Sequence, residues 1–158
     1  MEEKSTFEEI LNRDGRLVYT NVGISMMPLI REGRDIIVIE KCDVSALKKY
    51  DAVLFKRENV KGRGRYVLHR ILKVLPDNNF YIVGDHDTSG ETVNAGQILG
   101  VLTDILRDGK KYDFGSFGYK AYIFFICTLY PMRFACLRIK RFLKYAVGAV
   151  LYKLKLRR

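Results

Sequence analysis

The spacing of hydrophobic and polar residues changes twice along the chain and so divides it into three stretches. In the first stretch, residues 1–16, Thr6-Phe7-Glu8-Glu9 has the form of a capping box. This motif predicts a short helix that runs to about Asn12 and ends at Asp14-Gly15. The helix is expected to precede the main body of the fold.

The second stretch, residues 17–115, contains short runs rich in Val, Ile, Leu and aromatic residues, separated by Gly, Asp, Asn or Pro. These runs predict strands over residues 17–22, 35–40, 51–56, 66–75, 80–83 and 98–106. Asp108-Gly109 then predicts a tight turn into residues 110–114. The pattern is typical of a mainly β domain with little helix.

The third stretch, residues 116–158, mixes aromatic and basic residues. Its apolar run over residues 121–130 is about half the length of a bilayer-spanning helix, which needs roughly twenty residues. Pro131 and Arg133 prevent the run from extending further. Beyond Pro131, aromatic and basic positions recur as they do in a helix that lies in a membrane interface. We expect residues 116–158 to form a helical segment that associates with a membrane.

The charge of the chain supports this expectation. The protein has 158 residues and a formal net charge of +10; all 18 acidic residues lie at or before Asp113, whereas ten of the 28 Lys and Arg residues follow it. Each positive charge near an anionic lipid surface contributes about 1 kcal/mol to the free energy of binding. We expect no nucleic-acid partner, because the chain lacks a Gly-rich phosphate loop, a zinc finger and an aromatic RNA-binding motif. The remaining alternative is a helix packed on the β domain with a solvated basic face.

Two locations follow from these features. Residues 1–20 are acidic and polar, unlike a signal peptide, so we expect the N-terminus to start in the cytoplasm. Peripheral attachment to the cytoplasmic face of the plasma membrane is favoured. In the alternative, residues 119–137 insert and the β domain lies outside, an orientation that the basic residues after this segment would fit.

The candidate chemistry begins at Ser25, in Gly23-Ile24-Ser25-Met26-Met27-Pro28. Gly23 frees the backbone to turn and Pro28 restricts it, so the serine hydroxyl can be held at a fixed angle. His69 lies in an otherwise apolar predicted strand, residues 66–75. Ser25 is a candidate nucleophile and His69 a candidate base; the alternatives are an ordinary turn serine and a hydrogen-bonded core histidine.

An acidic partner for His69 is suggested by hairpin geometry. Residues 76–79 connect two predicted strands, and pairing Leu75 with Phe80 would bring His69 opposite residues 84–87. In strict register His86 faces His69, whereas a bulge or a slip of one residue brings Asp85 or Asp87 to it. A carboxylate there would fix the imidazole tautomer and stabilise its charged form.

Five short motifs in order resemble the LexA/signal peptidase superfamily of serine peptidases, over residues 17–106. They are Gly23-Ile24-Ser25-Met26-Met27-Pro28, Gly33-Arg34-Asp35-Ile36-Ile37-Val38, Tyr50-Asp51-Ala52-Val53, Leu68-His69-Arg70-Ile71 and Gly84-Asp85. A histidine in the place of the usual lysine base is similar to the Ser-His branch, the signal peptidases of the endoplasmic reticulum, of archaea and of some spore-forming bacteria.

The resemblance implies a LexA/signal peptidase-like β fold with Ser25 as the nucleophile, His69 as the base and Asp85 or Glu91 as the orienting acid. It also implies substrate contacts at Met26, Met27 and Pro28. The chain departs from the family where Gly23 replaces a frequent serine, so the oxyanion would depend on backbone N–H groups such as that of Ser25. Glu91 stands where an aspartate is usual, and no membrane anchor precedes Ser25.

The expected function is therefore a serine endopeptidase of signal-peptidase type that cleaves a leader or signal peptide from a peptide or preprotein. The alternative is a catalytically inactive module of this fold that binds a membrane surface or a protein partner. No cofactor is expected, and no metal site, because His69 and His86 lack further ligands at suitable spacing. His86 is expected to be a hairpin or cleft residue, and the sequence leaves the oligomeric state open.

Overall fold

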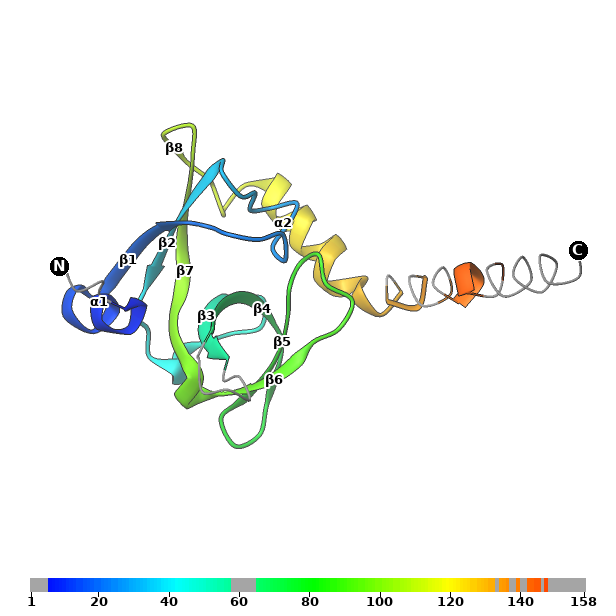
Figure 1. Ribbon diagram of the computed structural model, residues 1–158, viewed down its shortest axis with the longest axis horizontal. Helices are drawn as coiled ribbons and strands as arrows, with labels where there is room; N and C mark the ends of the chain where they lie inside the picture. Colours follow the sequence, from blue (N-terminus) through cyan, green and yellow to red (C-terminus); the bar gives the residue numbers. More distant parts are fainter. Residues whose placement is uncertain are drawn as a thin grey trace, which may run out of the picture.

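The computed structural model describes residues 6–57, 65–132, 134–136, 139, 142–145 and 147. Its strands are β1 (Arg16–Thr20), β2 (Asp35–Glu40), β3 (Ala52–Arg57), β4 (Arg65–Leu75), β5 (Asn79–Val83), β6 (Glu91–Asn94), β7 (Ile98–Arg107) and β8 (Lys110–Lys111). They form one curved antiparallel sheet in the order β1-β2-β7-β3-β4-β5-β6, with β8 paired to β7 (Figure 1). The prediction of a mainly β protein with an N-terminal helix and a helical C-terminal segment is confirmed.

The N-terminal helix, α1 (Phe7–Asp14), forms for the reason that its sequence indicates. The Thr6 hydroxyl accepts the Glu9 N–H at 3.3 Å, and the Glu9 carboxylate accepts the Thr6 N–H at 2.9 Å. Gly15, with φ 69°, ends the helix in the left-handed conformation that glycine adopts without strain. The helix extends two residues beyond the predicted end and buries Leu11 in the core.

All six predicted runs contain strands, but one strand was missed. β6 has the sequence Glu-Thr-Val-Asn, in which only Val93 is buried, so it carries almost no apolar signal. It forms because the edge of β5 offers a backbone partner, with Phe80 opposite Val93. Two short 3-10 turns, η1 (Val44–Ala46) and η2 (Ala95–Gln97), complete the β domain.

Alternating residues of β4 face two different environments. Leu68 belongs to a hydrophobic cluster that includes Leu11, Met26 and Ile37, whereas Ile71 belongs to a second cluster on β3, β5 and β6. Successive side chains of a strand point to opposite faces, so the neighbours His69 and Arg70 also diverge. This divergence decides which acidic residue each of the two can reach.

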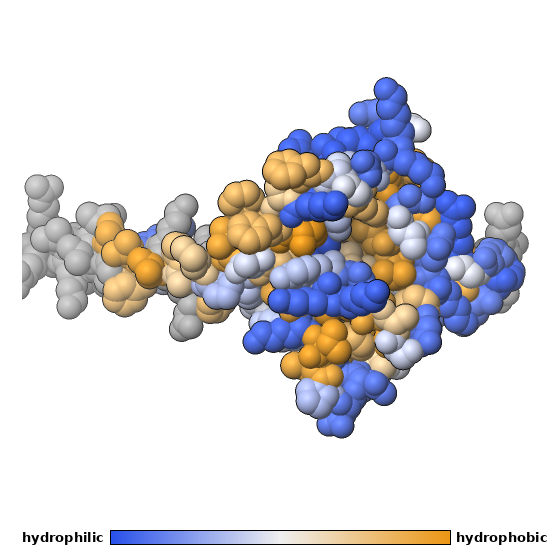
Figure 2. Space-filling model, turned by 180° about the vertical axis from the view of Figure 1, so that it is seen from behind, coloured by the Kyte–Doolittle hydropathy of each residue, from blue (hydrophilic) through white to orange (hydrophobic). Residues whose placement is uncertain are grey.

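The C-terminal segment begins with α2 (Phe117–Ile123), continues as one π-helical turn, η3 (Phe124–Thr128), and is helical again at the described residues beyond Leu129. Its first part packs on the β domain, where Tyr119, Tyr122 and Cys127 contact core residues, and the described residues beyond it extend away from the domain (Figure 1). Large hydrophobic residues on it are exposed: Phe117, Phe124, Phe125, Met132, Ile139, Phe142, Leu143, Tyr145 and Val147. Figure 2 shows hydrophobic surface along this projection.

Within the described part of the chain, no helix has both the length and the apolar character needed to cross a membrane.

Candidate active site

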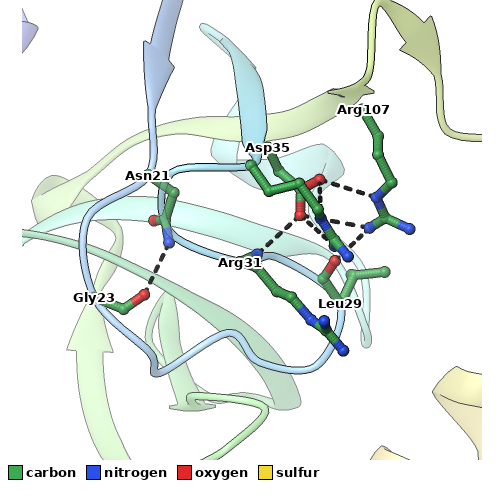
Figure 3. A network of polar contacts seen from close by, with 7 residues as sticks. Asn21, Gly23, Leu29, Arg31, Asp35 and Arg107 are labelled. Atoms are coloured by element: carbon green, nitrogen blue, oxygen red, sulfur yellow. Dashed lines mark hydrogen bonds and ion pairs between the residues drawn. The ribbon is translucent and has the colours of Figure 1, made fainter.

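The loop that carries Ser25 connects β1 to β2 and is fixed by a buried carboxylate (Figure 3). Asp35 is fully buried, and its oxygens accept the Arg31 N–H at 2.8 Å and hydrogen bonds from the Arg34 and Arg107 guanidinium groups. Arg107 also donates to the Leu29 carbonyl at 2.8 Å. The end of the loop is thereby joined to β2 and β7.

The charge on Asp35 is strongly favoured. Burial alone would raise its pKa, but hydrogen bonds from Arg34, Arg107 and the Arg31 amide lower the pKa to about 2. Asp35 is therefore ionised at neutral pH, and the loop is held by charge-assisted hydrogen bonds.

Ser25 lies at the other end of this loop, where it meets the turn after β5. Gly23 has φ 103°, a conformation that favours glycine, and its carbonyl accepts the Asn21 side-chain amide at 3.2 Å. The Ser25 carbonyl accepts the His86 N–H at 2.8 Å. Ser25 is partly buried and contributes to the wall of a cavity.

We call this the Ser25 cavity; it has a volume of about 670 Å³. It is lined by Tyr19 and Thr20 of β1, residues 21–25, residues 65–69 of β4, and Phe7, Arg57 and Asp87. Ser25 and His69, 44 positions apart in the sequence, thus share one cavity. β1 pairs only with β2, and the first half of β4 pairs only with β3, so the described residues leave two strand edges unpaired beside the cavity.

His69 is buried between two acidic side chains. Its Nε2 lies 3.4 Å from Asp87 Oδ2 and its Nδ1 lies 3.6 Å from Glu91 Oε1. Burial lowers the pKa of His69, Asp87 and Glu91 oppose this effect, and the net pKa lies below the ordinary value of 6.5. The imidazole is therefore neutral at neutral pH, the form that can accept a proton.

Glu91 has a second partner, Arg57 of β3. The Arg57 guanidinium binds both carboxylate oxygens of Glu91, with Nε to Oε2 at 2.9 Å. It also lies over the ring of Phe55, which in turn contacts His69 with ring centroids 5.9 Å apart. The arrangement holds Glu91 beside Nδ1 of His69.

Asp85 does not take the place that the family resemblance implies. It is 3% exposed and accepts two hydrogen bonds from the buried Arg70, Nε to Oδ1 at 2.8 Å and Nη2 to Oδ2 at 2.7 Å. The Tyr122 hydroxyl donates to Asp85 Oδ2 at 2.6 Å. The expectation that Asp85 orients His69 directly is corrected here, because both of its oxygens bind other groups on the opposite face of β4.

The strand register explains this outcome. Leu75 pairs with Asn79 rather than Phe80, and a bulge between Ile71 and Lys73 brings Arg70 opposite Val83. The predicted irregularity is thus present, although it lies in β4. The residues after Val83 then turn, with the Asp87 N–H bonded to the Gly84 carbonyl at 2.9 Å, and the Asp87 side chain faces His69.

The predicted substrate contacts at Met26, Met27 and Pro28 lie outside the Ser25 cavity. Met26 is 1% exposed and packs in the hydrophobic core, so the prediction for its side chain is corrected. Met27 is partly buried and Pro28 exposed, but neither lines the cavity. His86 is exposed, and its backbone N–H donates to the Ser25 carbonyl.

Two site residues were missed from the sequence, Arg57 and the buried Arg70. Arg70 carried a signal, because a cation inside the apolar run Leu68–Leu72 requires a buried partner. Arg57 carried none, since a basic residue at the end of a strand is ordinary. Among the described residues no group of His, Cys, Asp and Glu side chains is arranged to hold a metal ion.

Comparisons with protein-family models, with curated proteins and with solved structures gave no match to this chain.

Proposed function

We propose that the protein is a serine endopeptidase of the LexA/signal peptidase type that uses a Ser-His mechanism on a leader or signal peptide. The observation that carries the proposal is the convergence of Ser25 and a buried, neutral His69 on one cavity. A nucleophile and a base from distant segments, together in a cleft, are the minimum for acyl transfer.

The reaction follows from the roles of these two groups. His69 takes the proton of the Ser25 hydroxyl as its oxygen attacks the peptide carbonyl carbon. The carbon–nitrogen bond then breaks, and His69 gives the proton to the leaving amine. Water, activated by His69, releases the acyl group and restores Ser25. Glu91 orients His69 through Nδ1, and Arg57 holds Glu91 in place.

The substrate binds in an extended conformation. The unpaired edges of β1 and β4 beside the cavity offer backbone donors and acceptors, and an extended peptide can add to such an edge as a further strand. Phe7, Tyr19 and Tyr66 form an aromatic wall at this place, with ring centroids 4.8 Å apart for each pair with Phe7. A leader with apolar side chains would pack there.

The test is cleavage of a pooled library of leader-like peptides by the detergent-solubilised protein. We expect Ser25→Ala and His69→Ala each to lower kcat/KM by at least about 1,000-fold, because the two act as a unit. Ser89→Ala and His86→Ala are matched controls, since both residues are exposed and lie outside the cavity. Equal losses of kcat/KM in the control variants would contradict the assignment of Ser25 as nucleophile and His69 as base.

The alternative is an inactive module of this fold that binds a membrane or a protein partner. Gly23, which offers no side-chain donor for an oxyanion, is the feature that favours it. An activated acyl probe separates the two, because an enzyme is labelled at Ser25 and an inactive module is not. Absence of both labelling and cleavage would support the module.

We also propose that the C-terminal segment attaches the enzyme to anionic lipid at the cytoplasmic face of the plasma membrane. Its exposed aromatic residues and its excess of positive charge support this. At such a surface the substrate would be the leader of a peptide that is matured before export.

A further inference from the structure

The imidazole of His69 faces two carboxylates, one at each nitrogen. A neutral imidazole carries a single N–H and can donate it to only one of them. The second carboxylate then faces a nitrogen lone pair, which it repels. The tautomer of His69 therefore depends on which carboxylate attracts the proton more strongly.

The two carboxylates differ in their partners. Both oxygens of Glu91 bind the Arg57 guanidinium, whose positive charge offsets that of the carboxylate. Asp87 pairs with no Lys or Arg within the described residues, and its side chain is 40% exposed. In the same structure Nδ1 of His69, on the Glu91 side, is buried without a hydrogen bond to any described residue. These contacts favour the proton on Nε2, toward Asp87.

The position of Asp87 makes this choice consequential for Ser25. A Cβ atom placed on Gly84 would clash with Asp87 Oδ2 and lie 2.8 Å from the Ser25 carbonyl oxygen, so both border the same small space. Because Nε2 is the nitrogen that faces Asp87, we take it to be the one on the Ser25 side of the ring. A base must present a lone pair to its nucleophile, so Asp87 and Ser25 compete for Nε2.

We propose that Asp87 is a positioning residue that holds His69 in the tautomer protonated on Nε2 while the Ser25 cavity is empty. This inference rests on the proposed function. An extended peptide in the cavity offers backbone N–H groups to which the exposed Asp87 carboxylate turns. Nε2 of His69 then gives its proton to water, and Nδ1 receives one from water through the partly exposed Glu91 carboxylate. The charged groups that influence His69 are Asp87, Glu91, Arg57 and the more distant Asp85, which is fixed by Arg70.

The first experiment reads the tautomer directly, by ¹⁵N NMR of histidine-labelled protein without substrate at about pH 8, where the imidazole is neutral. We expect the His69 proton on Nε2 in the wild type and on Nδ1 in Asp87→Asn, whose amide can donate to Nε2. Asp77→Asn, the same change on an exposed hairpin, should leave the tautomer unaltered, and His86 serves as an internal reference. A wild-type proton on Nδ1, or no change in Asp87→Asn, would overturn the proposal.

The second experiment measures the dependence of kcat/KM on pH. Asp87→Asn removes a carboxylate that favours the imidazolium, so the acid limb should move to lower pH, and the plateau should rise about threefold or more. An unmoved limb, or a plateau about tenfold lower at unchanged KM, would mean that Asp87 does not restrain His69 in this way. If the wild type cleaves nothing, the proposed function fails, but the NMR result still decides the tautomer.

Discussion

At the scale of single residues, the pKa of His69 predicts the acid limit of activity. Burial lowers this pKa and the neighbouring carboxylates only partly restore it, so His69 is still mostly neutral at pH 6.5, its ordinary pKa. We expect the acid limb of the wild-type kcat/KM profile to lie below about pH 6.5. A limb above that value would contradict the buried environment of His69.

Removing Arg57 should shift the acid limb of the kcat/KM profile in the opposite direction to removing the Asp87 carboxylate. Its positive charge lowers the pKa of His69, and its removal also leaves Glu91 unpaired beside Nδ1. Arg57→Gln is therefore expected to move the acid limb to higher pH. Arg65→Gln is the matched control, since Arg65 lines the same cavity but makes no ion pair with the described acidic residues. A shift to lower pH in Arg57→Gln would refute the argument.

At the scale of elements, the Ser25 loop depends on Asp35. The pKa of Asp35 is about 2 in the folded protein and about 3.9 in an unfolded chain, which corresponds to roughly 2–3 kcal/mol of stability above pH 4. Because the folded pKa is the lower one, this stability is lost as the pH falls from about 4 toward 2. Asp35→Asn should lower the free energy of unfolding, measured by urea denaturation at pH 7, by about 2 kcal/mol. Near pH 2 the free energies of the variant and the wild type should differ less.

The buried pair Arg70–Asp85 joins β4 to the turn after β5 and, through the Tyr122 hydroxyl, to α2, and the loss of this pair should cost more stability. Asp85→Asn leaves Arg70 charged and unpaired at 1% exposure, so we expect a loss of about 3–5 kcal/mol in the free energy of unfolding. Asp104→Asn, which breaks the surface pair with Lys111, should cost less than about 1 kcal/mol. A stable Asp85→Asn variant without cleavage would instead support the role that the family resemblance implies.

Strands could be predicted where apolar residues follow one another, as in residues 35–40. They could not be predicted where a strand forms only through backbone pairing with its neighbour, as in β6. Ser25 and His69, which share one cavity, could be singled out from the sequence because a serine in a Gly/Pro turn and a histidine in an apolar strand stand out locally. Asp87 and Glu91 were among the acidic partners predicted for His69, but the sequence could not separate them from Asp85, because one bulge in β4 brings Arg70 to Asp85 and leaves Asp87 for His69. Register differences of one residue depend on packing across the whole sheet.

At the scale of the whole molecule, a charge-balanced β domain carries a C-terminal helix whose first part packs on it and whose described residues beyond η3 extend away from it. Phe125 and Phe142 on this helix are more than half exposed, and no acidic residue follows Asp113 to repel anionic lipid. Aromatic side chains and positive charge together are what binds an amphipathic helix to a membrane interface. We expect the protein to float with vesicles of phosphatidylcholine that contain phosphatidylserine and not with phosphatidylcholine alone.

The double variant Phe125→Ser/Phe142→Ser should lower this binding at least about tenfold, because each phenylalanine contributes apolar surface to the interface. Val18→Ser, which removes an exposed apolar side chain from β1, is the matched control and should bind as the wild type does. In cells, peripheral attachment predicts release from membranes by high salt or carbonate. Protein that resists both washes would instead indicate insertion of residues 119–137, with the β domain and the Ser25 cavity on the outer side.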